Sequence, residues 1–305
     1  MYVTAPQAFL RDRVAAVYSK TATLKNGEAV EVLDREKRFV KVRTSSGAEG
    51  WMEQRYLISQ EVFDRFSALT REHQSDPAQS TGTTRNDTNL HIAPGRDTDH
   101  LYQLPAGSKL SLLARGMAER SGVVAAPAPS KKKDSQPAGP PMEDWWLARD
   151  AQGRAGWVLA RMVDLDVPLE IAQYAEGQRF TAFFVLNEVQ DGDKKVPQYL
   201  VLMTDPKDGQ PYDYDKAHVF TWNVKKHRYE TAYRERNLNG VLPVTVTHED
   251  FGKEGNLPVF ILRVKDDAGN VSERKYKMNT PIVRRVLAPG EAAPTRTVAA
   301  KKKRR

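Results

Sequence analysis

The sequence predicts an all-β protein: two small β-barrels in tandem with a short linking helix between them, followed by a larger antiparallel β-barrel or sandwich. Short runs of β-branched and aromatic residues alternate with polar residues, as half-buried strands require. The 19 glycines and 18 prolines recur between these runs, as is typical of the turns that connect the strands of an all-β chain. A third observation, an internal repeat, divides the chain into modules.

The repeat has two halves, each with six residues that recur at identical spacing. In the first half the matched residues are Leu10, Leu24, Gly27, Val30, Val32, Leu33 and Leu90, Leu104, Gly107, Leu110, Leu112, Leu113. In the second half they are Val40, Gly47, Gly50, Trp51, Arg55, Leu57 and Trp146, Gly153, Gly156, Trp157, Arg161, Val163. Between the halves the second copy carries a 26-residue insertion, rich in Pro, Ala, Ser and Lys, within residues 116–142. Twelve matches indicate a duplicated module.

The pattern inside each copy predicts five short strands that form a small, partly open barrel. Residues 30–32 and 39–42 alternate apolar and polar side chains around a polar turn. Gly50 precedes Trp51, where the backbone must bend to fold a large ring into the barrel. Because so small a module buries little surface, we expect Trp51 and its counterpart Trp157 to be structural core residues.

This arrangement resembles the bacterial Src-homology-three (SH3) domain. The resemblance rests on an opening Leu-Arg, a long variable loop, Gly-x-x-Val-x-Val, and Gly-x-x-Gly-Trp before a terminal apolar residue. Residues 8–57 fit it closely, and residues 89–163 fit it once the insertion is removed. The resemblance implies modules that sit outside the cytoplasm and bind peptidoglycan, often attached to wall hydrolases. It therefore implies a periplasmic or cell-envelope protein, exported with a signal peptide that is absent from this chain.

Five parts of the chain are predicted. They are the first SH3-like barrel at 1–58, a helix and linker at 59–84, the second barrel at 85–166 with a disordered insertion at 116–142, an antiparallel β domain at 170–290, and a disordered basic tail at 291–305. Residues 59–73 place Val62, Phe63, Phe66 and Leu69 at helical spacing, which predicts a short amphipathic helix. Residues 75–84 are polar and predict a linker.

The third unit has a different pattern of strands and turns, and we recognise no family in it. A helical turn is predicted at residues 171–174. Strands are then predicted at 180–189, 199–204, 218–224, 229–234, 241–246, 259–264, 271–277 and 282–286. Strands of this length, separated by explicit Asp/Gly/Pro turns, predict a closed antiparallel barrel or a two-sheet sandwich.

Composition excludes several classes of function. Of the net charge of +8, five units come from residues 301–305, so the remainder of the chain is close to neutral. A dedicated nucleic-acid domain would instead carry its basic residues on structured elements, so no specific nucleic acid is expected as a partner. The absence of cysteine excludes thiol catalysis, disulfides and cysteine metal sites. No apolar run reaches the length of about 18 residues that a membrane span needs.

The residues that carry chemistry form no catalytic pattern. The six histidines lack tight metal-ligand spacing; His91 and His100, in one loop with Asp97 and Asp99, are predicted to belong to a solvated loop rather than a metal site. The acidic, aromatic segment 205–215 lacks the alternation of a calcium loop and is predicted to be ordinary turn. Nucleophile elbows and phosphate-binding glycine loops are absent. We therefore predict no catalytic residue, no metal and no cofactor.

Five aromatic side chains are candidates for ligand binding, because aromatic rings on a barrel face stack on sugars and peptides. Tyr18 lies in the long loop of the first module and Tyr56 near its end, while Tyr102 lies in the second module. Trp145 and Trp146 are adjacent there. Since neighbours on a strand face opposite ways, one of the two tryptophans is predicted to point out of the core.

Three functions compete on these observations. The leading hypothesis is a non-enzymatic envelope scaffold whose tandem modules bind peptidoglycan or another envelope component. The first alternative is a protein–protein adaptor whose grooves take extended peptides from a protein partner. The less favoured alternative is a hydrolase of cell wall or carbohydrate acting through the C-terminal domain, against which the sparse histidines and the missing nucleophile motif count.

Overall fold

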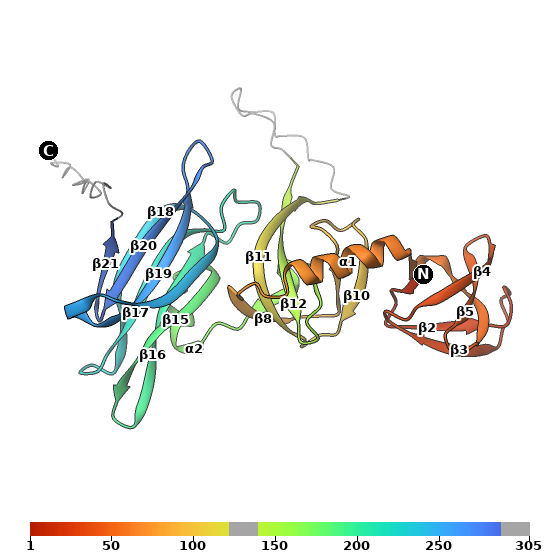
Figure 1. Ribbon diagram of the computed structural model, residues 1–305, viewed down its shortest axis with the longest axis horizontal. Helices are drawn as coiled ribbons and strands as arrows, with labels where there is room; N and C mark the ends of the chain where they lie inside the picture. The colour runs from red at the N-terminus through yellow and green to blue at the C-terminus, as the bar shows by residue number, and fades with distance from the viewer. Residues whose placement is uncertain (122–139, 288–305) are drawn as a thin grey trace. The chain divides into compact units, whose positions relative to one another are not determined.

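Strands make up most of the computed structural model of the chain, which describes residues 1–121 and 140–287 (Figure 1). The predicted all-β class is confirmed. The chain divides into two compact units, Met1–Phe183 with Met203–Asp213, and Phe184–Leu202 with Tyr214–Arg305. None of the helices within the described ranges has the length and apolar character that a transmembrane helix needs.

The first module consists of seven short strands. They are β1 (Tyr2–Val3), β2 (Gln7–Arg11), β3 (Lys20–Lys25), β4 (Val30–Glu36), β5 (Phe39–Thr44), β6 (Glu49–Glu53) and β7 (Leu57–Ile58). Five of them form one sheet in the order β3-β2-β6-β5-β4, while β1 pairs with β7. The sheet does not close into a barrel within this part of the chain, which agrees with the partly open form predicted from the pattern.

The core of the first module is built from alternate residues of its strands. Leu10, Val40, Val42 and Met52 are fully buried in it. On β6 the inward positions belong to Gly50 and Met52, because a Cβ at Gly50 would lie 2.8 Å from the Cβ of Leu10. The residue between them therefore faces the other side of the sheet.

That intervening residue is Trp51, and it is half-buried rather than part of the core. Its counterpart Trp157 is half-buried as well, while Val158 takes the fully buried position on the strand. A Cβ at Gly156 would lie 2.8 Å from the Cβ of Leu90, just as a Cβ at Gly50 would lie 2.8 Å from that of Leu10. The core position that was expected for each tryptophan is therefore occupied by the residue that follows it. Alternate residues of a strand share a face, so the glycine before the tryptophan and the residue after it both point inward.

The predicted helix is confirmed as α1 (Gln60–Glu72). The hydroxyl of Ser59 caps it by accepting a hydrogen bond from the backbone N–H of Val62. Phe66 is its buried residue, and the ring of Phe63 stacks on Tyr2 with centroids 3.7 Å apart. The amphipathic face of the helix is therefore used for packing.

The second module again has seven strands. They are β8 (Ser80–Thr84), β9 (Thr88–His91), β10 (His100–Leu104), β11 (Lys109–Glu119), β12 (Met142–Asp150), β13 (Ala155–Leu159) and β14 (Val163–Leu165). Their order is β10-β9-β13-β12-β11-β8-β14. The first five positions repeat the order of the first module strand for strand, and β8 pairs with β14 as β1 pairs with β7.

Two boundaries differ from those expected. Residues 80–84 were predicted to be linker but form β8, because their backbone pairs with β11 and β14. Strands β11 and β12 also continue into the insertion, where Gly116 pairs with Trp145 and Glu119 with Met142. Disorder was predicted for 116–142, which is wrong at both ends of that range; residues 122–139 within it, and the predicted basic tail at 291–305, lie outside the described residues.

A short helix, α2 (Leu169–Ala172), confirms the predicted helical turn and precedes the last sheet. Its seven strands are β15 (Arg179–Asp191), β16 (Lys194–Thr204), β17 (Tyr214–Asn223), β18 (Arg228–Asp250), β19 (Asn256–Lys265), β20 (Val271–Asn279) and β21 (Ile282–Val286). They follow one another in chain order across a single sheet. Within the described residues this is neither the closed barrel nor the two-sheet sandwich expected.

The long strand β18 accounts for one difference in strand number. Residues 229–234 and 241–246 were predicted as separate strands but belong to this one strand, which pairs with β17 along its first half and with β19 along its second. Its pairing with β19 shifts between Val241 and Thr245, so the strand bends without ending. The stacked rings of Phe260 and Tyr276, with centroids 4.9 Å apart, belong to the core of this sheet.

A candidate binding groove in the first module

A groove of about 310 Å³ runs along strands β2 and β6 of the first module. Two of its lining residues are Tyr18, from the loop between β2 and β3, and Tyr56, from the turn after β6. Both were predicted from the sequence as ligand-binding candidates. The fold brings them together although they are far apart in the chain.

The loop that carries Tyr18 is held closed at its base by Asp12. This carboxylate accepts hydrogen bonds from the guanidinium of Arg13 at 2.8 and 3.0 Å and from the backbone N–H of Ser19 at 2.8 Å. The bonds from Arg13 and then Ser19 lower the pKa of Asp12. Tyr18 follows from this base as an exposed ring, 37% accessible, at one wall of the groove.

Arg11 places a positive charge beside that ring. Its guanidinium carbon lies 4.1 Å from the ring centre of Tyr18 and 5.1 Å from that of Phe39. One of its nitrogens is 3.7 Å from a carboxylate oxygen of Glu53, which also lines the groove. A cation over an aromatic face is held by electrostatic attraction, so the guanidinium of Arg11 has a defined position in the groove next to the carboxylate of Glu53.

Tyr56 also lines the groove. Its ring packs against the core of the first module, and its hydroxyl accepts a hydrogen bond from Arg55 at 2.7 Å. The guanidinium of Arg55 also lies 4.7 Å from the ring centre. The lining of the groove thus includes three aromatic residues, Phe9, Tyr18 and Tyr56, with one guanidinium and one carboxylate, a set suited to binding a zwitterionic chain.

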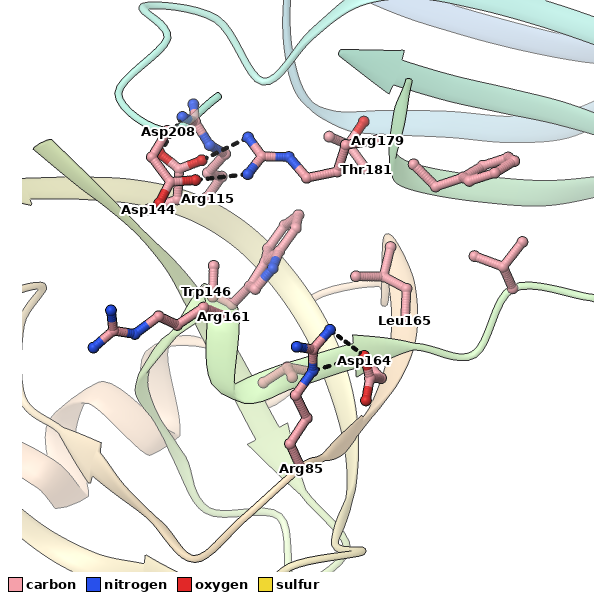
Figure 2. A pocket seen from close by; sticks show the side chains of 14 residues that line it. Arg85, Arg115, Asp144, Trp146, Arg161, Asp164, Leu165, Arg179, Thr181 and Asp208 are labelled. Atoms are coloured by element: carbon pink, nitrogen blue, oxygen red, sulfur yellow. Dashed lines mark hydrogen bonds and ion pairs between the residues drawn. The ribbon is translucent and has the colours of Figure 1, made fainter. Parts of the chain in front are cut away.

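Trp145 and Trp146 do face opposite ways, but neither is exposed. Trp145 is 2% and Trp146 4% accessible. Trp145 packs edge-on against the ring of His91, with centroids 5.2 Å apart. Trp146 lines a different cavity on the other face of β12 (Figure 2). The expectation that one tryptophan leaves the core is wrong because both faces of this strand are covered.

Tyr102 and Trp157 are also placed away from the groove. The ring of Tyr102 meets Phe66 of α1 edge-on at 6.0 Å and lies under the guanidinium of Arg154 at 4.4 Å. Burial raises the pKa of Tyr102. Trp157 presses on Gly116, where a Cβ would come within 2.6 Å of its ring. These two aromatics therefore pack the second module.

The residues weighed for metal binding do not converge. The rings of His91 and His100 have centroids 5.5 Å apart, and burial lowers the pKa of both. Asp208 and Asp215 are each paired with a different cation, Arg179 at 2.7 Å and an adjacent lysine at 2.8 Å. Residues 1–121 and 140–287 contain no group of three side chains able to hold a metal ion together.

Sequence reasoning missed both charged residues of the groove, Arg11 and Glu53. Arg11 stands in the Leu-Arg opening of the repeat, where it was noted only as part of a pattern. Its register partner Trp51 brings β6 alongside β2, and Glu53 lies two residues further on the same face. The alternation of side chains along β6, which places Glu53 on the same face as Trp51, is therefore the sequence signal that could have identified Glu53.

Comparison with known proteins identifies the class of this module. Residues 7–58 match the family model of the bacterial SH3 domain, and most of the groove lies inside that match. This part of the chain is a bacterial SH3 domain. Among curated proteins, none shows significant sequence similarity to the chain.

Two solved structures are similar to the chain at low sequence identity. An NlpC/P60 family protein from Bacillus cereus is 13% identical with a TM-score of 0.25; the match covers 62% of this chain and 64% of that one. NlpC2 from Trichomonas vaginalis is 12% identical with a TM-score of 0.19, over 93% of this chain and 94% of that one. Both scores are too low to bear on the activity of this chain.

Proposed function

We propose that the chain is a non-enzymatic binding protein of the cell envelope, at the wall or in the periplasm, whose first module recognises peptidoglycan through the Tyr18–Tyr56 groove. The observation that carries the proposal is the convergence of these two tyrosines on one groove of a bacterial SH3 domain. Domains of this class are typical of envelope proteins, which supports the location.

The chemistry of the groove supports a peptide as the part of the wall that is recognised. Stem peptides of peptidoglycan are extended and carry both carboxylates and amines. Arg11 is placed to pair with a carboxylate and Glu53 with an amine, while the rings of Tyr18 and Tyr56 supply flat apolar surface. The same chemistry serves an extended protein segment, so the adaptor hypothesis predicts the same groove with a different occupant.

The second module takes the role of a scaffold in this proposal. Its repeated residue spacing and strand order support a duplicated module. The groove residues, however, are not repeated, since Thr98 stands at the position of Tyr18, His91 at that of Arg11 and Met162 at that of Tyr56. The second module therefore does not repeat the groove of the first.

Co-sedimentation of the full chain with purified, insoluble peptidoglycan tests the proposal. We expect the unaltered chain to sediment and a Tyr18→Ala/Tyr56→Ala variant to remain in the supernatant. Val17→Ala is the matched control, because Val17 is next to Tyr18 in the same loop but 85% exposed and outside the groove. Each protein is measured at low and moderate salt, since a basic protein sediments non-specifically with an anionic polymer when screening is weak.

Two results would count against the groove. If the double variant sediments as well as the unaltered chain, the tyrosines are not the contact. If the unaltered chain sediments only at low salt, its positive charge rather than the groove is responsible. Loss of wall binding altogether would direct the search to extended peptides and hence to the adaptor function.

A further inference from the structure

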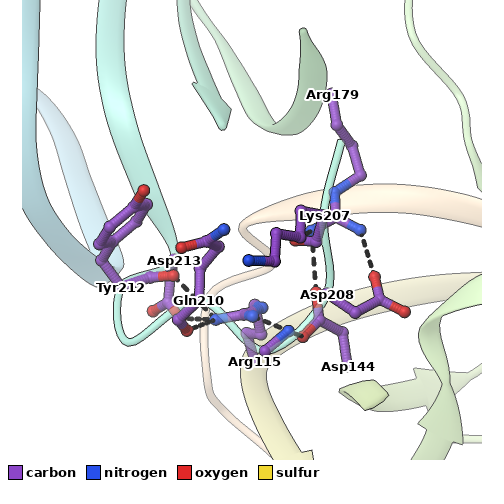
Figure 3. Close-up of polar contacts among 9 residues, drawn as sticks. Arg115, Asp144, Arg179, Lys207, Asp208, Gln210, Tyr212 and Asp213 are labelled. Carbon is purple, nitrogen blue, oxygen red and sulfur yellow. Dashed lines mark hydrogen bonds and ion pairs between the residues drawn. The ribbon is translucent and has the colours of Figure 1, made fainter. Parts of the chain in front are cut away.

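A network of charges in the first compact unit neutralises itself (Figure 3). Asp144, whose side chain is 3% exposed, accepts hydrogen bonds from Arg115, which is 5% exposed, and from Arg179 at 2.8 Å. Arg115 also donates to the backbone carbonyl of Tyr212 at 2.8 Å. Because these groups satisfy one another, the network stabilises the fold and leaves little charge for a partner. Exposed charge without a countercharge is found instead in the second compact unit.

Two hairpin tips lie side by side in that second unit. One connects β15 to β16 at residues 192–193, and the other connects β17 to β18 at residues 224–227. The carboxylate of Asp191, at the end of β15, accepts hydrogen bonds from the indole N–H of Trp222 at 2.8 Å and from the ring of His227 at 2.7 Å. One carboxylate therefore holds the two tips together.

The tip between β17 and β18 is a tight turn that begins at Asn223. The backbone N–H of Lys226 donates to the carbonyl of Asn223 at 3.1 Å, which closes a four-residue turn. The side-chain oxygen of Asn223 accepts hydrogen bonds from the backbone N–H groups of Lys225 and Lys226, each at 3.1 Å. Val224 and Lys225 therefore occupy the two corners of the turn, and Val224 is 44% exposed there.

The paired tips carry an excess of positive charge. Together, residues 191–195 and 223–230, which we call the basic tip, contain five lysines and arginines and three acidic residues. Two of the carboxylates are already used, because Asp191 joins the tips and Glu230 pairs with Lys226 at 2.9 Å. Three exposed lysines have ammonium groups that form no ion pair within the part of the chain that the structure describes: Lys194, Lys195 and Lys225.

An exposed valine beside unpaired lysines is the composition of a surface that docks on an anionic lipid bilayer. Lysines are attracted to the negative headgroups of such a bilayer. An apolar side chain leaves water when it enters the boundary between the headgroups and the acyl chains. A soluble polyanion would use the lysines alone and leave Val224 in water. The two features together therefore favour a lipid surface over other anionic partners.

We propose that the basic tip docks on the surface of an anionic phospholipid bilayer, with Val224 entering the headgroup region and Lys194, Lys195 and Lys225 next to the lipid phosphates. The turn is already fixed by Asn223, so little ordering accompanies the docking. None of these residues lines the groove of the first module, so the proposal does not depend on wall recognition.

Sedimentation of the full chain with phospholipid vesicles at moderate salt tests the proposal. The vesicles consist either of phosphatidylcholine alone or of an equal mixture of phosphatidylcholine and phosphatidylglycerol. We expect the chain to bind the anionic mixture and not the neutral lipid. The Lys194→Gln/Lys195→Gln/Lys225→Gln variant should bind the mixture about a hundredfold more weakly, since each lysine near an anionic surface contributes about fivefold.

Single variants separate the position of a residue from its chemistry. Lys225→Gln should weaken binding about fivefold, whereas Lys253→Gln, which removes the same charge at an exposed position beyond the other end of β18, should change it less than about twofold. Val224→Ser should weaken binding about three- to tenfold. Ile282→Ser, at a 52% exposed apolar position on β21, should not weaken it. All four residues are exposed, so the thermal unfolding midpoint should stay unchanged.

The five basic residues at 301–305 also attract anionic lipid, so the triple variant is compared with the unaltered sequence in a chain that ends at residue 300 as well. We expect the same loss of binding there. The proposal is overturned if neutral and anionic vesicles bind alike, if the triple variant binds like the unaltered chain, or if removal of residues 301–305 abolishes binding. It is also overturned if Val224→Ser binds vesicles normally and soluble polyphosphate binds the chain as tightly as the vesicles do, because the basic tip is then a polyanion site.

Discussion

The guanidinium of Arg11 lies over the ring of Tyr18, 4.1 Å from its centre, and joins the last residue of β2 to the long loop that follows. The same guanidinium approaches Glu53 at 3.7 Å across the sheet. The side chain of Arg11 thus contacts both the ring of Tyr18 and the carboxylate of Glu53 in the groove. The loop is positioned by this contact and by the hydrogen bond from the backbone N–H of Ser19 to Asp12, which closes its base.

Substitutions at Tyr18 should separate its ring from its hydroxyl. Tyr18→Phe keeps the face on which Arg11 lies, so we expect peptidoglycan binding within about twofold of the unaltered chain. Tyr18→Ala removes the ring and frees the loop, and should weaken binding about three- to tenfold. The fraction of protein sedimented at increasing peptidoglycan concentration measures both. Equal binding by the two variants would show that the ring is not a contact.

Gly50→Ala should destabilise the first module by about 1–3 kcal/mol. A Cβ there would lie 2.8 Å from the Cβ of Leu10 and 2.9 Å from the backbone oxygen of Arg11, so two strands must separate to admit it. Urea unfolding followed by tryptophan fluorescence reports the change. Val17→Ala, at an 85% exposed position, sets the baseline. A loss below about 0.5 kcal/mol would contradict the close approach of β2 and β6.

Asp144→Asn should cost the first compact unit about 3–5 kcal/mol, because it leaves Arg115 buried without a full countercharge. The change is isosteric, so packing is preserved and the loss reports the charge. Asp164→Asn removes a carboxylate that is 58% exposed and pairs with Arg85; it should cost at most about 0.5 kcal/mol. Equal urea midpoints for the two variants would be inconsistent with a buried network at Asp144.

The stability of the second module should decline as the pH falls below about 6.5. Burial lowers the pKa of His91 and His100 below the ordinary histidine value of 6.5, so the unfolded chain takes up protons that the folded chain does not. The penalty is absent above pH 6.5 and grows as the pH falls toward the folded pKa values. Carboxylates titrate lower, so the interval from pH 7 to 5.5 isolates histidine.

Thermal unfolding midpoints of the full chain at pH 7 and 5.5 measure this effect. A His91→Asn/His100→Asn variant should show a smaller decrease than the unaltered chain. His248→Asn is the control, since His248 is exposed. An identical decrease in the double variant would assign the pH dependence to other groups.

Several features of the fold follow from local pattern. Alternation placed the strands of the last sheet, and helical spacing with Ser59 before it placed α1. The third unit was nonetheless predicted to be a barrel or sandwich. Its strands do not close, and β18 continues through a stretch predicted to separate two strands. Local pattern does not determine how long a strand remains paired, because that depends on its neighbours.

The candidate site was partly predictable for the same reason. Tyr18 and Tyr56 were chosen as aromatic residues outside the expected core, and both line the groove. Trp145 and Trp146 were chosen by the same argument but are buried. Alternation tells which neighbours face opposite ways, whereas the exposure of each face depends on what packs there.

By itself, the sequence determined the all-β class, the repeated spacing and the bacterial SH3 character of the first module, because each depends on residues close together along one strand or turn. Only the tertiary structure decided that Arg11, Tyr18, Glu53 and Tyr56 share one groove and that Trp145 and Trp146 are both buried. Contacts between distant residues depend on register and on which sheet face is covered. Those are properties of the assembled sheet rather than of any single strand.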